Sequence, residues 1–196
     1  METGKTIRNV LTYAVVILVF GVAVPWGKGI GFFDPVLLAA YACLGILFAG
    51  PAAAQAFEQA PASMAQALQW IVKAALFGEL LAAAMVGCGV GTVYLTARGY
   101  VFPPDLELLA YSLGLGLAAS LALAALAGWM TIRLSPAASR IALRVVYLAL
   151  VALFYFKGRW LPAVVAQAAL FSLLAAVLFV MLLRMRLAIP AGGVKS

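Results

Sequence analysis

Long apolar runs dominate this chain, and short polar or turn-forming stretches interrupt them. A helix needs about 20 predominantly apolar residues to cross the hydrocarbon core of a bilayer. Several runs approach or exceed that length, so the pattern predicts six membrane-spanning helices. The expected spans cover approximately 9–26, 35–54, 74–97, 107–132, 139–156 and 161–185.

Three of the breaks between these runs share one composition. Residues 26–35, 98–105 and 157–162 combine glycine or proline with aromatic and charged side chains. Glycine and proline mark turns, and tryptophan and tyrosine are enriched at the level of the lipid headgroups. We therefore expect these three breaks to be short turns at the membrane surface.

The break between the second and third spans has a different pattern. Residues 55–73 are polar enough to leave the membrane, yet they are rich in the helix formers Ala, Gln, Met and Leu. Met64, Leu68 and Ile71 recur at helical spacing, and Ser63 is a suitable N-cap. The pattern predicts a short amphipathic helix on the cytoplasmic surface that runs into the third span. A helix that merely joins two spans fits the pattern equally well.

The composition agrees with a membrane protein. Hydrophobic residues make up 67% of the chain and charged residues only 10%, and the mean hydropathy is +1.14. An ordinary soluble domain is about half apolar and about a quarter charged. We predict an all-α, polytopic membrane protein with a single transmembrane domain over residues 1–186 and a short cytoplasmic tail over 187–196.

The distribution of Lys and Arg predicts the orientation, because short cytoplasmic loops carry the excess of positive charge. The larger set comprises Lys5, Arg8, Lys73, Arg133, Arg140, Arg144, Arg184, Arg186 and Lys195. The smaller set comprises Lys28, Arg98, Lys157 and Arg159. Both termini are therefore expected in the cytoplasm, with the chain in the inner or plasma membrane. The net charge of +7 is scattered rather than clustered, so no nucleic-acid partner is expected.

Catalytic and nucleotide-binding motifs are weak in this sequence. Gly4-Lys5-Thr6 matches only the end of the phosphate-binding loop, whose leading glycine and preceding strand are not found before it. The chain has no histidine, and its six acidic residues form no pair at helical spacing inside a predicted span. We expect no enzyme activity, no metal site and no cofactor. Cys43 and Cys88 lie in apolar runs and are expected to be free thiols.

Glu79 is an exception among the acids because it lies one to two turns inside the third predicted span. An acid at that position is costly unless it faces protein, water or the interface. One interpretation is a partner contact or a salt bridge, for example with an arginine of the 133–144 loop. The other is a carboxylate that still lies at headgroup depth.

Small residues recur inside two of the spans. Gly87 and Gly91 stand four residues apart in the third span, and Gly114, Gly116, Ala118 and Ser120 recur in the fourth. Such faces let helices approach closely in lipid. Packing within one subunit is the usual explanation, and a dimer interface is the less common one.

Taken in order, these segments resemble the membrane subunit of ABC-2 type transporters. That family has six spans, both termini in the cytoplasm, and a cytoplasmic segment before the third span. The segment is matched here by residues 54–59, 65–73 and 77–81. Residues 125–138 are similar to the family's fourth span and the turn after it, and residues 155–162 to its last outer turn.

The resemblance implies a permease subunit that moves a hydrophobic or lipid-like substrate. Its partners would be separate ABC-type ATPase subunits and a second permease copy or a paralogue. The implied coupling residues are Phe57, Glu58, Gln59, Met64, Leu68, Trp70, Lys73 and Glu79. A non-transporting membrane anchor or scaffold of a larger complex is the alternative. A small secondary carrier is disfavoured by the scarcity of charge inside the spans.

Overall fold

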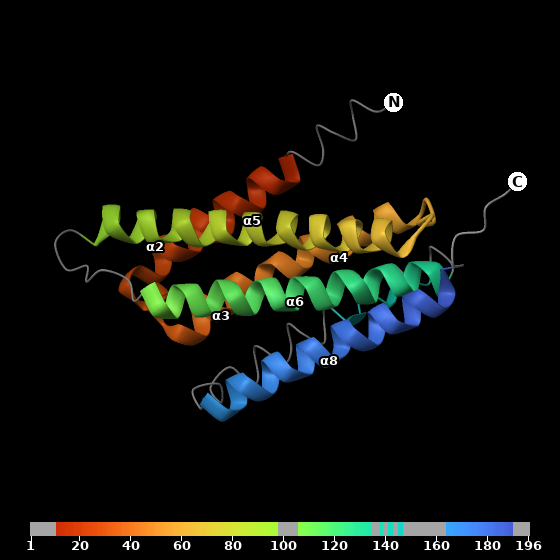
Figure 1. The fold of residues 1–196 in the computed structure, drawn as a ribbon. Helices are drawn as coiled ribbons and strands as arrows, with labels where there is room; N and C mark the ends of the chain where they lie inside the picture. Colours follow the sequence, from red (N-terminus) through yellow and green to blue (C-terminus); the bar gives the residue numbers. More distant parts are fainter. Residues whose placement is uncertain are drawn as a thin grey trace, which may run out of the picture.

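Helices make up all the secondary structure in the described part of the chain. The computed structural model describes residues 11–97, 106–134, 138, 141–142, 145–146 and 164–189 (Figure 1). Three helical stretches are long and apolar enough to cross a membrane, namely Leu11–Phe33, Met64–Thr96 and Leu109–Arg133. The all-α class and the membrane character are thus supported, whereas six spans stay a prediction. The predicted fifth span falls mostly outside the described residues.

The first helical stretch runs past its predicted end at residue 26. It contains a π-helical turn, η1 (Val19–Ala23), then α2 (Val24–Lys28) and the 3₁₀ helix η2 (Gly29–Phe33). The α-helix ends at Lys28, inside the break predicted over 26–35, and Gly29 adopts a φ of 53° there. Residues Gly29–Phe33 then form a tight 3₁₀ helix. The chain reverses only at Asp34.

The second predicted span is helical but divided. It consists of α3 (Pro35–Ala42), a 3₁₀ turn η3 (Cys43–Gly45) and α4 (Ile46–Phe57). The Oδ1 atom of Asp34 accepts a hydrogen bond from the backbone N–H of Leu37 at 3.2 Å, which caps the start of α3. The helical stretch therefore begins as expected and ends slightly later than residue 54.

The predicted surface helix and the third span form one continuous helix, α5 (Met64–Thr96). Ser63 caps it as predicted, since its Oγ accepts a hydrogen bond from the backbone N–H of Gln66 at 3.2 Å. The Gln66 side chain in turn accepts from the N–H of Ala62 at 2.8 Å. This reciprocal pair resembles a capping box and fixes where the helix begins.

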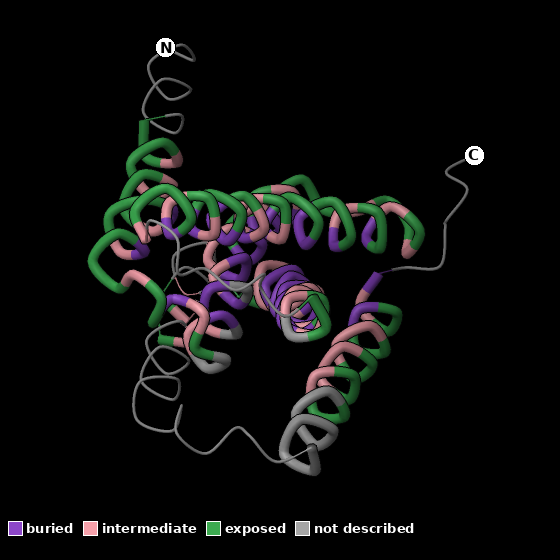
Figure 2. Tube along the Cα trace, turned by 90° about the vertical axis from the view of Figure 1, so that its left-hand side faces the viewer, coloured by how far each residue is buried: buried purple, intermediate pink, exposed green. Residues whose placement is uncertain are grey.

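The last two described helices follow the apolar pattern closely. α6 (Leu106–Arg133) matches the predicted 107–132 to within one residue at each end. α8 (Val164–Ala188) begins and ends slightly after the predicted 161–185. α5 and α6 lie antiparallel, with α4 between them and α8 against α6. Figure 2 shows that buried residues lie where helices face one another, while the outer faces are exposed.

Glycines determine how closely α5 approaches its neighbours. A Cβ atom added to Gly78 would collide with the carbonyl oxygen of Gly45 and lie 3.0 Å from Ala49. A Cβ added to Gly89 would meet the ring of Phe32. By contrast, a Cβ added to Gly87 or Gly91 meets nothing within 4 Å in the described structure. The expected close packing therefore occurs on α5, but at other glycines than the pair that the spacing indicated.

One further contact joins α5 to the first helical stretch, through a hydroxyl that also bonds within α5. The Thr92 hydroxyl donates to the carbonyl oxygen of Gly21 in the π-helical turn at 3.3 Å, and to that of Cys88 at 2.8 Å. Interhelical hydrogen bonds of this kind contribute to helix association in lipid. Cys88 and Cys43 are both free thiols, as predicted.

Replacing Gly78 by Ala should destabilise the bundle, because the added methyl group meets backbone atoms of Gly45 and Ala49 that cannot rotate away. Overpacking of this kind costs about 1–3 kcal/mol. The matched control is Gly87→Ala on the same helix, where the methyl group meets open space. Thermal unfolding of the purified protein in detergent should show a lower Tm for Gly78→Ala only. Equal Tm values would mean that the Gly45–Gly78 approach is not a constraint.

Candidate functional site

Most of the predicted coupling residues lie in a tight turn between α4 and α5 and in the first turns of α5. Backbone hydrogen bonds run from Glu58 N–H to the Ala54 carbonyl at 3.2 Å and from Ala60 N–H to the Phe57 carbonyl at 3.1 Å. Ala60 adopts a φ of 51°, in the left-handed region that L-residues rarely enter. The turn is therefore defined by its own backbone contacts and leads directly to the Ser63 cap.

Phe57 anchors this turn inside the bundle. Its side chain is only 2% exposed, and its ring meets the Trp70 ring edge to face with centroids 5.4 Å apart. A Cβ atom added to Gly128 would lie 2.8 Å from the Phe57 ring, so α6 has room for this ring only because residue 128 is glycine. Phe57 is thus a core residue rather than a surface available to another protein.

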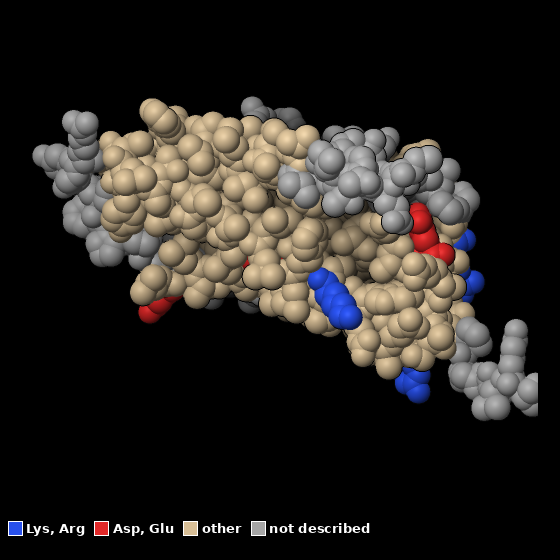
Figure 3. Space-filling view, turned by 90° about the horizontal axis from the view of Figure 1, so that it is seen from above, with Lys and Arg blue, Asp and Glu red and all other residues tan. Residues whose placement is uncertain are grey.

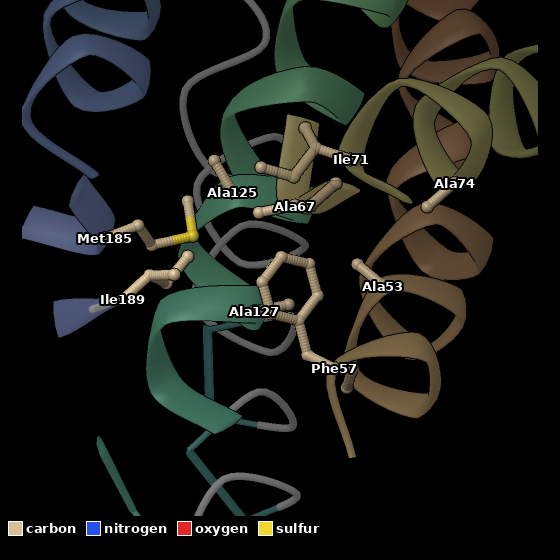
Figure 4. Close-up of a cluster of buried hydrophobic side chains, with 11 residues drawn as sticks. Ala53, Phe57, Ala67, Ile71, Ala74, Ala125, Ala127, Met185 and Ile189 are labelled. Carbon is tan, nitrogen blue, oxygen red and sulfur yellow. The ribbon is translucent and has the colours of Figure 1, made fainter. Parts of the chain in front are cut away.

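Phe57 belongs to a larger group of buried side chains that we call the inner cluster (Figure 4). Its members come from α4, α5, α6 and α8 and are mostly alanines, which bring the helices close together. The inner cluster comprises Ala53, Ala54, Phe57, Ala67, Ile71, Ala74, Ala124, Ala125, Ala127, Met185 and Ile189. It holds the first turns of α5 firmly against the other helices.

The face that the start of α5 buries differs from the predicted stripe. Ala67 and Ile71 are buried, Met64 packs partly against the inner cluster, and Leu68 is 39% exposed. Leu68 was expected to lie on the apolar face because Met64, Leu68 and Ile71 recur at helical spacing. The small Ala67 faces the bundle instead, since close helix contacts favour small side chains.

The opposite side of this helix end presents an exposed strip that we call the outward face. It comprises Leu68, Gln69, Val72 and Lys73, which are neighbours at helical spacing. Of the predicted coupling residues, Leu68 and Lys73 thus lie on the outward face. Glu58 and Gln59 are exposed in the turn before it.

The remaining predicted coupling residues face other surroundings. Phe57 is buried, while Met64 and Trp70 are partly covered by the inner cluster. In the space-filling view most charged side chains lie in one half of the molecule, and uncharged residues cover the rest of that face (Figure 3). An uncharged surface of this extent is expected for a bundle surrounded by lipid.

Glu79 lies further along α5 than the outward face; it is half-buried, and both of its carboxylate oxygens are covered. It follows Gly78, which packs against Gly45, midway along α5. A Cβ on Gly45 would be 3.0 Å from both the Gly78 carbonyl and the Oγ of Ser120, which stands near the middle of α6. This position favours a carboxyl enclosed by protein over one at headgroup depth.

The suggested salt bridge to the loop after the fourth span is not formed by its first arginine. Arg133 lies about 20 Å along α6 from Ser120, at 1.5 Å per residue, and therefore far from Glu79. Both carboxylate oxygens of Glu79 are buried and have no hydrogen-bond partner among the described residues. Arg140 and Arg144 lie outside the described residues.

Polar and thiol side chains on η3, α5 and α6 gather at the contact between η3 and α5, and we call this group the interior polar cluster: Cys43, Glu79, Tyr111 and Ser120. Cys43 lies close enough to interact electrostatically with Glu79 and with Tyr111. Ser120 is fully buried, and its hydroxyl has no hydrogen-bond partner in the described structure. The sequence pattern indicated Cys43 as a buried thiol and Ser120 as a small packing residue, and it did not single out Tyr111. No group of metal-ligating side chains occurs among the described residues.

Comparison with known proteins adds no assignment: no protein-family model, curated protein or solved structure matches this chain. Two regions of the structure, the outward face and the interior polar cluster, carry the features that bear on function.

Phe57→Ala should be strongly destabilising, because it removes a buried ring and leaves a cavity between Trp70 and Gly128. Such truncations cost about 3–5 kcal/mol. Leu68→Ala removes an exposed side chain and should change stability by less than about 0.5 kcal/mol. Thermal unfolding in detergent compares the two variants. If Leu68→Ala lowered the Tm as much as Phe57→Ala, the burial pattern described for this helix end would be wrong.

Proposed function

We propose that this chain is the membrane-spanning subunit of an ATP-driven transporter, similar to ABC-2 permeases, with ATP hydrolysed by separate ATPase subunits. In this proposal the chain has six spans and both termini in the cytoplasm. The observation that carries it is the continuity of α5, a helix of 33 residues. At 1.5 Å per residue it is about 50 Å long, against a hydrocarbon core of about 30 Å. In this proposal the first turns of α5, with the outward face, extend from the membrane.

The packing at this end supports transmission of a movement into the bundle. The turn after α4 and the first turns of α5 are joined through Phe57 and Trp70 and are packed on α6 at Gly128. A push on the outward face would move them as one body, together with the rest of α5. An ATPase can shift such an equilibrium only if its affinity for the outward face differs between the two membrane states.

The chemistry of the outward face suits a helix bound in a groove of another protein. Leu68 and Val72 offer an apolar centre, and both are exposed. Gln69 and Lys73 lie beside them and can form the polar rim that such interfaces have. Glu58 and Gln59 add polar groups in the preceding turn.

The proposal also includes a second membrane subunit and a hydrophobic substrate. A second permease copy or a paralogue would complete the transporter, as in the family that the sequence resembles. Exposed apolar side chains cover the outside of the described helices, including Leu80, Leu95 and Phe179. These surfaces suit lipid, and they are the reason for proposing a hydrophobic or lipid-like substrate.

The double replacement Leu68→Asp and Val72→Asp should abolish ATPase binding, because it puts two charges into the apolar centre of the outward face. We expect the full-length variant, purified from its native membranes, to retain less than about a tenth of the ATPase that accompanies the unchanged chain. A tenfold loss corresponds to about 1.4 kcal/mol. The matched control is Leu95→Asp, which changes an 84% exposed leucine at the other end of α5.

Three outcomes would contradict the proposal. An ATPase retained in full by the double variant would show that the outward face does not bind it. Equal loss with Leu95→Asp would mean that any exposed charge disrupts the assembly. Partners without a nucleotide-binding subunit would favour the alternative of a membrane anchor or scaffold.

A further inference from the structure

The Glu79 carboxyl is the acidic group most enclosed by the bundle among the described residues, and the coupling function does not account for it. Both of its oxygens are buried, and the described part of the chain gives them no hydrogen-bond partner. It lies where the backbones of α5 and η3 are closest, next to the Gly78–Gly45 contact. A fully buried, unpartnered hydroxyl, that of Ser120, borders the same contact from α6.

The titratable side chains nearest to the middle of α5 on the elements that pack on it are tyrosines and a cysteine. Cys43 of η3 interacts electrostatically with Glu79, and Tyr111 of α6 interacts with Cys43. α3 contributes the buried Tyr41, and Tyr13 of the first helical stretch packs on Phe77, two residues before Glu79, with ring centroids 5.8 Å apart. The described part of α4 contains no titratable side chain.

The basic residues of the described structure lie elsewhere. Lys73 precedes Glu79 on α5 by about 9 Å of helix rise and is exposed on the outward face. Arg133 stands at the end of α6, and Lys28 at the opposite end of the bundle is exposed. No ion pair of Glu79 is present among the described residues.

Surroundings without a cation favour the neutral, protonated form of a carboxyl group over the ionised carboxylate. Burying an ionised carboxylate without a cation costs several kcal/mol, even after the protein relaxes. Burying the neutral acid costs only its unmade hydrogen bonds. The acid can also donate its O–H, whereas the carboxylate can only accept.

We propose that Glu79 is a proton-binding site inside the membrane domain, occupied while η3 and α5 are in contact and emptied when that contact opens to water. The proton is taken up by a Glu79 carboxylate oxygen and returned to water from the same atom. Movement of α5 at the Gly45–Gly78 contact is thereby linked to binding of one proton. This proposal is independent of the identity of any partner at the outward face.

Dicyclohexylcarbodiimide, an apolar reagent that enters the membrane, tests this directly. The acid adds across a C=N bond of the carbodiimide: the carboxyl oxygen bonds to the central carbon and the proton passes to nitrogen. The acyl group then migrates to nitrogen and leaves a stable N-acylurea, which peptide mass spectrometry locates. The full-length protein is treated in membrane vesicles, in parallel with a water-soluble carbodiimide.

We expect the apolar reagent to modify Glu79 and the water-soluble one to leave it at least tenfold less modified. Modification should fall at least tenfold as the pH is raised from neutral to strongly alkaline, because only the protonated acid reacts. Glu79→Gln should abolish the adduct. Glu107→Gln, at an exposed acid in the first turn of α6, should leave the Glu79 adduct unchanged.

Any of three results would overturn the proposal. The apolar reagent could leave Glu79 unmodified in the unchanged protein. Misfolding cannot explain that result, because the protein carries no substitution. Glu79 could react equally with both reagents, which would show a carboxyl open to water. Protection by saturating sodium chloride at constant pH would show that a metal cation rather than a proton occupies the site.

Discussion

The close approach of two backbones at Gly45 and Gly78 is the constraint on which the rest of this bundle depends. Helices in lipid gain nothing from hiding apolar surface, so they associate through close packing and a few polar contacts. Gly78 has no room for even one methyl group. Because η3 and α5 meet here, Cys43 and Glu79 are brought together in the interior, with Ser120 of α6 at the same level.

A second close contact, between Phe57 and Gly128, determines what the other end of the bundle can do. The Phe57 ring fills the space left by the missing side chain of residue 128 and fixes the turn before α5. The start of α5 consequently buries Ala67 and Ile71 and exposes Leu68. Packing of the core therefore determines which side chains the outward face exposes.

The outward face and Glu79 both lie on α5, and this gives α5 a special position. One end of it carries the outward face, and its middle carries the interior polar cluster. A continuous helix of 33 residues joins the two without a break. A force at one end and a proton at the middle would act on the same rigid element, which is the physical basis for linking them.

The apolar runs by themselves determined the helical class, the membrane character, the ends of α6 and the cap at Ser63, because run length and capping chemistry are local properties. They placed the ends of the first two helical stretches two to three residues too early, at 26 and 54 rather than at Lys28 and Phe57, since apolar content alone does not show how far packing extends a helix. Only the tertiary structure decided that Phe57 points inward, that Leu68 points outward and that Glu79 meets Cys43. Those choices depend on which backbones can approach closely, and that depends on residues far apart in the chain.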